Sequence, residues 1–109
     1  QAHHIAPREL RNNPVLRNFL DDIGFEFENG LRNGVMLPPD AAMRSGAWQS
    51  AAVHLGSHPN YTTRMASRID GIRMQYEMGN LTRQEALNNV HTLLANTKNR
   101  LMNGTELLN

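Results

Sequence analysis

Residues 59–103 constrain the fold most, because they carry two long helical patterns one after the other. In the first, apolar side chains recur at helical spacing and predict one buried stripe: Tyr61, Met65, Ile69, Ile72 and Tyr76. Gly79-Asn80 ends this segment. The run from Thr82 to Glu85 predicts a capping box for a last helix, which Gly104 ends. We expect that helix to direct four apolar side chains inward: Leu87, Val90, Leu94 and Leu101.

The first half of the chain predicts shorter elements. Asn13-Pro14 has the form of an N-cap with proline at the first helical position, and the helix that follows ends at Gly24. Asn29-Gly30 and Asn33-Gly34 are turn signals. A short apolar run, Val35 to Leu37, comes next, and we expect the little strand in the chain to lie near its histidines. The predicted fold is mostly α with a small β element.

Length and composition predict a single soluble domain over residues 1–109. Hydrophobic residues make up 39% of the chain, and no apolar run is long enough to span a bilayer, so we expect no membrane contact within this domain. The absence of cysteine excludes disulfides and thiolate chemistry. The chain starts abruptly within what resembles a motif, which indicates the C-terminal part of a longer protein.

The formal net charge of +1 predicts no overall basic field. Ten of the eleven basic residues are arginine, Lys98 being the exception. Arginine presents a planar fork of donors that matches paired phosphate oxygens. Genomic base composition explains the arginine preference equally well, so the preference alone does not decide between the two explanations.

The histidines give the strongest functional signal. Four of the five fall in two groups, His3-His4 and the pair His54 and His58. Neutral imidazole is a common nitrogen ligand for divalent metals, and a spacing of four can place two rings on one side of a helix start. A third histidine ligand must then be His3 or His4. His91, alone in a helical pattern, is interpreted as structural or solvated.

Adjacent histidines also suggest a division of roles. Neighbouring side chains of an extended segment point to opposite sides, so one ring can bind the metal while the other faces a water molecule. An imidazole with its ordinary pKa of about 6.5 is a suitable general base. The metal would stabilise negative charge on a phosphate, which favours a phosphodiester hydrolase. Each pair alone is more often a polar patch or a chance spacing; the two together favour a site.

Three blocks of sequence resemble the AHH nuclease family of the HNH/endonuclease VII superfamily. They are Ala2 to Pro7, Asn33 to Pro38 and His54 to Tyr61. The resemblance implies a ββα-metal finger, here elaborated with flanking helices because a helix is predicted between His4 and Asn33. It implies that His3 is the first metal ligand and that His54 and His58 are the paired ligands at the finger's helix. His4 resembles the catalytic general base. Asn33 resembles the superfamily's central asparagine, a catalytic-site residue that buttresses the loop beside the base.

Domains of this family are typical of bacterial toxins delivered between cells by secretion systems. The resemblance therefore implies a secreted or delivered effector that acts in the cytoplasm of the target cell, with a cognate immunity protein as partner. The expected activity is a metal-dependent endonuclease that cuts DNA. We expect Arg64 and Arg68, one turn apart, and Arg44 to hold substrate phosphates. The cofactor is one divalent ion: Zn, Ni, Mn or Mg.

Three alternatives stay open on the sequence. An RNase toxin of the same fold would use the same residues. A structural zinc module that binds a partner would close the metal with a fourth ligand and do no chemistry. A zinc protease is disfavoured, because the segment from His54 to His58 lacks the glutamate that such a helix needs.

Overall fold

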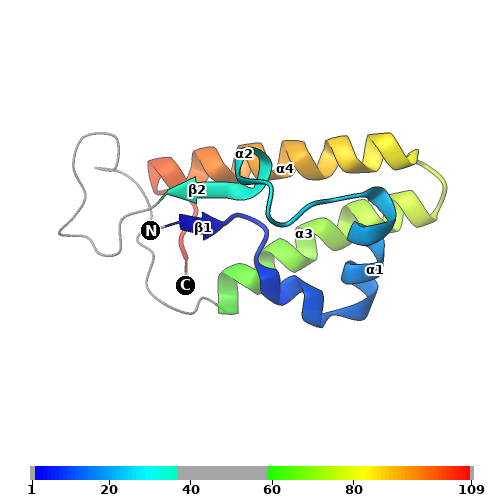
Figure 1. Cartoon of the computed structure of the whole chain (residues 1–109), viewed down its shortest axis with the longest axis horizontal. Helices are drawn as coiled ribbons and strands as arrows, with labels where there is room; N and C mark the ends of the chain where they lie inside the picture. Colours follow the sequence, from blue (N-terminus) through cyan, green and yellow to red (C-terminus); the bar gives the residue numbers. More distant parts are fainter. Residues whose placement is uncertain (1, 37–58, 109) are drawn as a thin grey trace.

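The computed structural model of the chain describes residues 2–36 and 59–108. In this part of the chain, helices make up most of the structure, and one small antiparallel sheet lies at the end that carries the N-terminus (Figure 1). The elements in chain order are β1 (Ala2–His4), the 3-10 helix η1 (Arg8–Asn12), α1 (Pro14–Ile23), α2 (Gly30–Asn33), β2 (Gly34–Met36), α3 (Pro59–Glu77) and α4 (Arg83–Asn103). The prediction of a mostly α fold with a small β element is confirmed. Arg44, His54 and His58 lie outside the described residues.

The two long patterns form α3 and α4, which lie side by side along the molecule (Figure 1). The capping box is present as predicted: the Thr82 hydroxyl accepts from the Glu85 N–H, and the Glu85 carboxylate accepts from the Thr82 N–H. Gly104 caps the far end of α4 at φ 79°, a left-handed conformation that favours glycine. None of the described helices is long and apolar enough to cross a bilayer.

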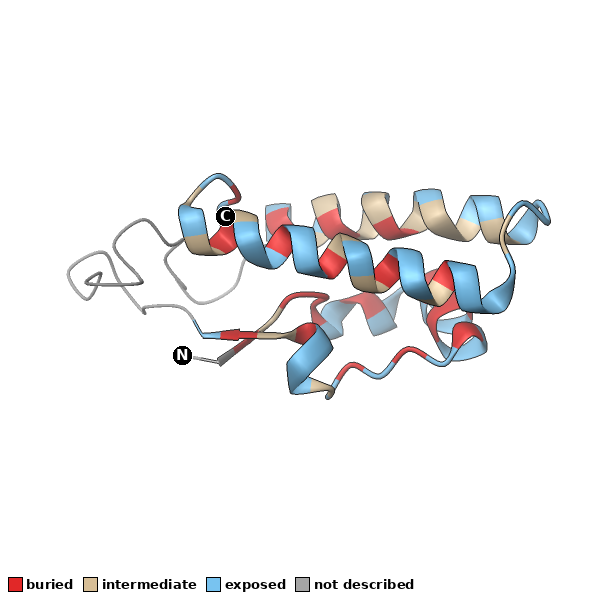
Figure 2. Cartoon of the chain, turned by 90° about the horizontal axis from the view of Figure 1, so that it is seen from above, coloured by how far each residue is buried: buried red, intermediate tan, exposed pale blue. Residues whose placement is uncertain are grey.

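The buried faces of α3 and α4 face each other and the shorter elements (Figure 2). The most deeply buried side chains of the two helices are Tyr61, Met65, Ile69, Ala86, Val90, Leu94 and Leu101. Leu87, Ile72 and Tyr76 are partly buried and pack at the edge of this core. The predicted stripes are therefore the core-facing sides of the two helices.

Helix α1 also follows its sequence signals. The Asn13 side chain accepts from the N–H groups of Val15 and Leu16, and Pro14 is the first helical residue. Gly24 ends the helix at φ 79°. The side chains that α1 buries are Leu16, Phe19, Leu20 and Ile23. These side chains anchor α1 on α3 and α4.

The region after α1 differs from the predicted turn. Asn29 does not form a hairpin turn with Gly30; its side chain instead accepts from the N–H groups of Leu31 and Arg32 and caps α2. Asparagine serves as an N-cap as readily as it serves in a turn, because both uses depend on the same short acceptor. The second signal, Asn33-Gly34, marks the change from α2 to β2. A Cβ at Gly34 would lie 2.7 Å from the Gly30 carbonyl oxygen, so this close approach requires glycine.

The sheet brings the start of the chain beside residues 34–36. Strand β1 pairs antiparallel with β2, with His3 opposite Val35 and His4 opposite Gly34. The two strands are far apart in sequence, and η1, α1 and α2 fill the interval between them. Among the described elements, β1 and β2 precede α3 in the order ββα, with helices inserted between the two strands.

Candidate active site

Strand β1 directs its two histidines to opposite sides, as the alternation of side chains in a strand requires. His3 is 5% exposed and its ring lies 5.5 Å from the ring of Tyr61 on α3. His4 is partly exposed, and its Nε2 lies 3.2 Å from a carboxylate oxygen of Glu28. One imidazole thus faces the start of α3, and the other faces solvent beside an acid.

Asn33 joins three separate backbone segments next to these histidines. Its side chain is buried at 1% exposure. The amide nitrogen donates to the carbonyl oxygens of Ala6, at 3.1 Å, and Phe27, at 2.9 Å. The amide oxygen accepts from the Ala6 N–H at 2.5 Å. Every polar atom of this side chain therefore fixes the loop that follows His4 against the segment that precedes α2.

Tyr61 connects β1 to α3 by a hydrogen bond as well as by packing. Its hydroxyl donates to the Ile5 carbonyl oxygen at 2.5 Å. Burial, and then the nearby negative charge of Glu106, raise the pKa of Tyr61 above its ordinary value, so the phenol stays a neutral donor. The start of α3 is held against the strand that carries both histidines.

A charged cluster around Glu28 was not predicted from the sequence. Arg8 donates to both oxygens of Glu28, from Nε and Nη2, at 2.9 Å each. Arg11 lies 3.7 Å from the same carboxylate. The hydrogen bond from Arg8, followed by the one from His4, lowers the pKa of Glu28 from 4.5 to about 2. Glu28 is therefore an ionised acceptor that His4 contacts. No sequence signal connects Glu28 to His4, which lies 24 positions away.

These residues surround a small pocket. Its volume is about 140 Å³, and it is lined by His3, His4, Phe27, Glu28, Gly30, Asn33 and Gly34. A water molecule takes about 30 Å³ of liquid volume, so the pocket has room for several waters or a phosphate group. An imidazole, a carboxylate and Asn33 all border this space, which suits proton transfer to or from a bound water.

The structure describes only part of the metal-ligand set that the sequence predicts. Among residues 2–36 and 59–108, no three histidine or acidic side chains converge to hold a metal ion. His3 is the one predicted ligand in this part of the chain, while His54 and His58 lie outside it. The donor chemistry fits, since three imidazoles are a common set for a divalent ion. Tyr61, three positions after His58 in the sequence, touches the ring of His3.

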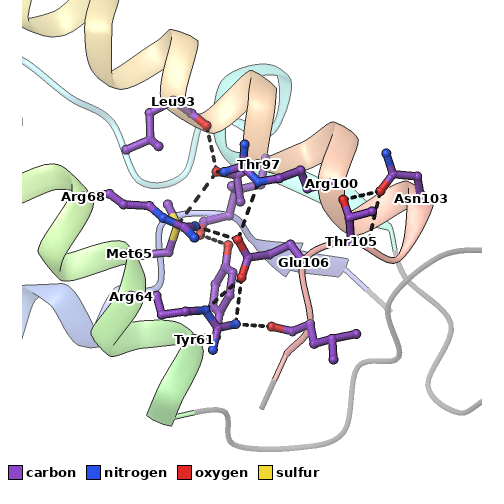
Figure 3. A network of polar contacts seen from close by, with 12 residues as sticks. Tyr61, Arg64, Met65, Arg68, Leu93, Thr97, Arg100, Asn103, Thr105 and Glu106 are labelled. Atoms are coloured by element: carbon purple, nitrogen blue, oxygen red, sulfur yellow. Dashed lines mark hydrogen bonds and ion pairs between the residues drawn. The ribbon is translucent and has the colours of Figure 1, made fainter.

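Two of the three predicted phosphate-binding arginines pair with an acid of the C-terminal tail (Figure 3). Arg64 Nε donates to Glu106 at 2.9 Å, and Arg68 Nη1 donates to it at 2.6 Å. Arg44 lies outside the described residues. Glu106 could not be singled out from the sequence, because an isolated acid after the last helix is ordinary surface composition.

His91 differs from the other described histidines in its surroundings. It is partly buried on α4, with its ring 6.1 Å from that of Phe25. Burial, and then the charge of Arg32, lower the pKa of His91. A neutral ring against an aromatic neighbour fits the structural interpretation of this residue.

Comparison with known proteins identifies the class of protein. A family model described as a nuclease family of the HNH/ENDO VII superfamily with conserved AHH matches residues 1–101. No curated protein and no solved structure matches the chain. The match covers both strands, the histidines, α3 and all but the last two residues of α4, and it defines the class as a nuclease. The chain belongs to the AHH family.

Proposed function

We propose that this domain is a metal-dependent endonuclease that hydrolyses phosphodiester bonds of DNA, with His4 as the general base. The observation that supports it is the state of His4: a solvent-accessible imidazole held by an ionised carboxylate, on the same strand as a buried imidazole. The family match supports nuclease chemistry. The choice of DNA, the metal and the roles of single residues are the proposal.

The contact with Glu28 supports Nδ1 as the nitrogen of His4 that acts in this proposal. An ionised carboxylate only accepts hydrogen bonds, so the 3.2 Å contact requires a proton on Nε2 of His4. In the neutral ring the lone pair then lies on Nδ1, and this atom takes the proton from water. Arg8 holds the carboxylate in place with two donors, so Glu28 keeps the ring oriented. Arg8 and Glu28 are positioning residues in this scheme.

His3, His54 and His58 would hold the divalent ion. When bound, the ion stabilises negative charge on the scissile phosphate and on the leaving oxygen. Zinc, nickel and manganese suit three imidazoles better than magnesium does. The hydrogen bond from Tyr61 to Ile5 and those of Asn33 to Ala6 brace β1 and the loop after it from two sides. This bracing holds β1, and with it His3 and His4, in place against α3 and α2.

We propose DNA because a base that activates water needs no ribose 2′-hydroxyl. The biological setting proposed with it is a toxin domain of a bacterial effector, delivered by a secretion system into the cytoplasm of a target cell. A cognate immunity protein would neutralise it in the producing cell. These points rest on the resemblance of the three sequence blocks to AHH toxins. An RNase of the same fold and a non-catalytic zinc module are the alternatives.

Plasmid nicking by the purified domain tests the proposal. Supercoiled DNA and total RNA are incubated separately with each metal or with a chelator. We expect conversion to open circles with metal and none with chelator. Cleavage of RNA alone would establish the RNase alternative. Bound zinc without cleavage of either substrate would establish the structural module. His91→Ala is the matched control for His4→Ala, because it removes a histidine outside the site.

A further inference from the structure

Three arginines from two helices converge around one buried acid near the C-terminal end of α4 (Figure 3). Arg64 and Arg68 come from α3, and Arg100 comes from α4, with its Nε 3.6 Å from Glu106. Together with Thr105 and Leu107 they line a pocket of about 420 Å³. We call Arg64, Arg68, Arg100 and Glu106 the arginine cluster.

Backbone contacts of the tail after α4 position Glu106 among the three arginines. Gly104 turns the chain, and the Glu106 N–H then donates to the Arg100 carbonyl oxygen at 3.1 Å. The Arg64 guanidinium also donates to the Leu107 carbonyl oxygen. Burial alone would raise the pKa of Glu106, but the hydrogen bonds from Arg68 and Arg64, together with the charges of these arginines, lower the pKa overall. Glu106 is therefore a charged group at 5% exposure.

Arginine outnumbers acid among the described residues that line this pocket. Arg68 and Arg100 alone carry two guanidinium charges against the single carboxylate charge of Glu106. Glu106 lies beneath, whereas the arginine side chains are 34–36% exposed. Each guanidinium has five N–H donors, and a carboxylate has two oxygens to receive them. The arrangement orders arginine forks in a fixed place while positive charge still faces solvent.

We propose that the arginine cluster binds a phosphate group of the nucleic-acid backbone, and that Glu106 is the buried counter-charge that holds the three guanidinium groups together. Planar forks fit phosphate oxygens in pairs, and forks that are already ordered lose less entropy on binding. Tyr61 links the cluster to the active site, since its ring lies 5.5 Å from His3 and 5.8 Å from the Arg64 guanidinium carbon. The nature of the ligand rests on the proposed nuclease function.

Arg100→Gln is the sharpest probe, because Arg100 has the longest contact with Glu106 and its loss leaves Arg64 and Arg68 bonded to that acid. Lys98→Gln is the matched control: it removes one positive charge from an exposed position of the same helix. Duplex DNA binding is measured by fluorescence anisotropy across a range of salt, in a His4→Ala background that prevents cutting. We expect Arg100→Gln to weaken binding and to reduce the slope of log K against log salt by about 1. Lys98→Gln should change neither.

A second measurement uses inorganic phosphate alone. In the wild-type domain, phosphate should shift the guanidinium N–H resonances of the cluster saturably, and Arg100→Gln should weaken this response. Equal losses of DNA binding in the Arg100 and Lys98 variants, or no loss in either, would overturn the proposal. Phosphate binding without any effect of Arg100→Gln on DNA would overturn it as well. If Arg100→Gln nicked plasmid normally and bound DNA as the wild type does, the phosphate-site proposal would be overturned and the nuclease proposal would stand. If Arg100→Gln alone lost DNA and phosphate binding, but the wild-type domain cut no nucleic acid, the phosphate-site proposal would stand and the nuclease proposal would be overturned.

Discussion

Asn33 hydrogen-bonds both backbone polar groups of Ala6, donating to its carbonyl oxygen at 3.1 Å and accepting from its N–H at 2.5 Å. Ala6 lies two residues after His4, and both Ala6 and Asn33 are almost completely buried. A third bond reaches the Phe27 carbonyl oxygen, beside Glu28. A single side chain therefore sets the distance between the strand that carries His4 and the segment that carries the acid that orients it.

Replacing Asn33 should cost stability as well as activity. Asn33→Ala leaves one buried N–H and two buried carbonyls without this partner, and we expect a loss on the order of 3 kcal/mol in the free energy of unfolding. Urea denaturation measures it. Asn89→Ala, at an exposed position of α4, is the control and should change stability by less than about 0.5 kcal/mol. A stability loss at Asn33 no larger than at Asn89 would contradict the bracing role.

The sequence predicted the elements whose signals are local. Thr82 to Glu85, Asn13 and Gly24 specify helix ends through contacts within four residues, and all three act as predicted. Asn29 was misassigned because the same side chain can cap a helix or form a turn, and only the tertiary context chooses between them. The alternation of His3 and His4 needed only the geometry of an extended strand.

Contacts across long stretches of sequence were beyond reach. Glu28 and Arg8 are 20 positions apart, and Glu106 and Arg64 are 42 apart. Neither Glu28 nor Glu106 lies in a recognisable sequence motif. Each pairs with an arginine that only the folded chain brings close to it. Arg64 and Arg68, which the sequence predicts to hold phosphate, also pair with Glu106, and that pairing could not be predicted.

His4→Ala should abolish nicking while fold and metal binding survive. His4 is partly exposed, so its removal leaves no core cavity. Loss of a positioned base lowers rates by about 10²- to 10⁴-fold. Plasmid nicking gives the rate, and calorimetric titration with a divalent ion gives metal affinity. His3→Ala, one residue away and buried, should lose both nicking and metal affinity. Near-normal nicking by His4→Ala, or equal loss of metal in both variants, would refute the division of roles.

Glu28 should remain ionised far into acid. Its lowered pKa means that its carboxylate stays ionised, and so accepts fully from Arg8 and His4, above pH 4.5; these contacts are lost only as pH falls toward about 2. The carboxyl carbon resonance of Glu28, followed by NMR against pH, reports the midpoint. Arg8→Met should raise this midpoint more than His4→Ala does, because the hydrogen bond from Arg8 is the largest cause of the lowered pKa. A midpoint near 4.5 in the wild-type domain would show that the cluster does not persist in solution.

Glu106→Gln should destabilise the domain even though it removes a charge from a tail. A neutral amide at this position would leave three clustered guanidinium groups without their buried counter-charge. Removal of one partner from a buried ion pair lowers the free energy of unfolding by on the order of 3 kcal/mol or more. Because the arginine partners of Glu106 are about one-third exposed, we expect a loss near the lower end of that range. Thermal unfolding measures the change. Glu77→Gln breaks the exposed pair with Arg73 and should have a much smaller effect, because water screens that pair. Equal effects of the two changes would mean that Glu106 is not a structural counter-charge.

Metal titration of three histidine variants tests the constellation as a whole. His54→Ala and His58→Ala should each weaken binding of a divalent ion and abolish nicking, because removal of one imidazole from a set of three leaves an incomplete site. His91→Ala should do neither, since His91 lies against Phe25 on α4 and its ring has a structural surrounding. Calorimetry at a pH about one unit above the ordinary imidazole pKa keeps the rings neutral, so proton competition does not mask the difference. The comparison separates loss of a ligand from a general effect of losing a histidine. If His91→Ala weakened metal binding as much as His58→Ala did, the assignment of His3, His54 and His58 as the ligand set would be wrong.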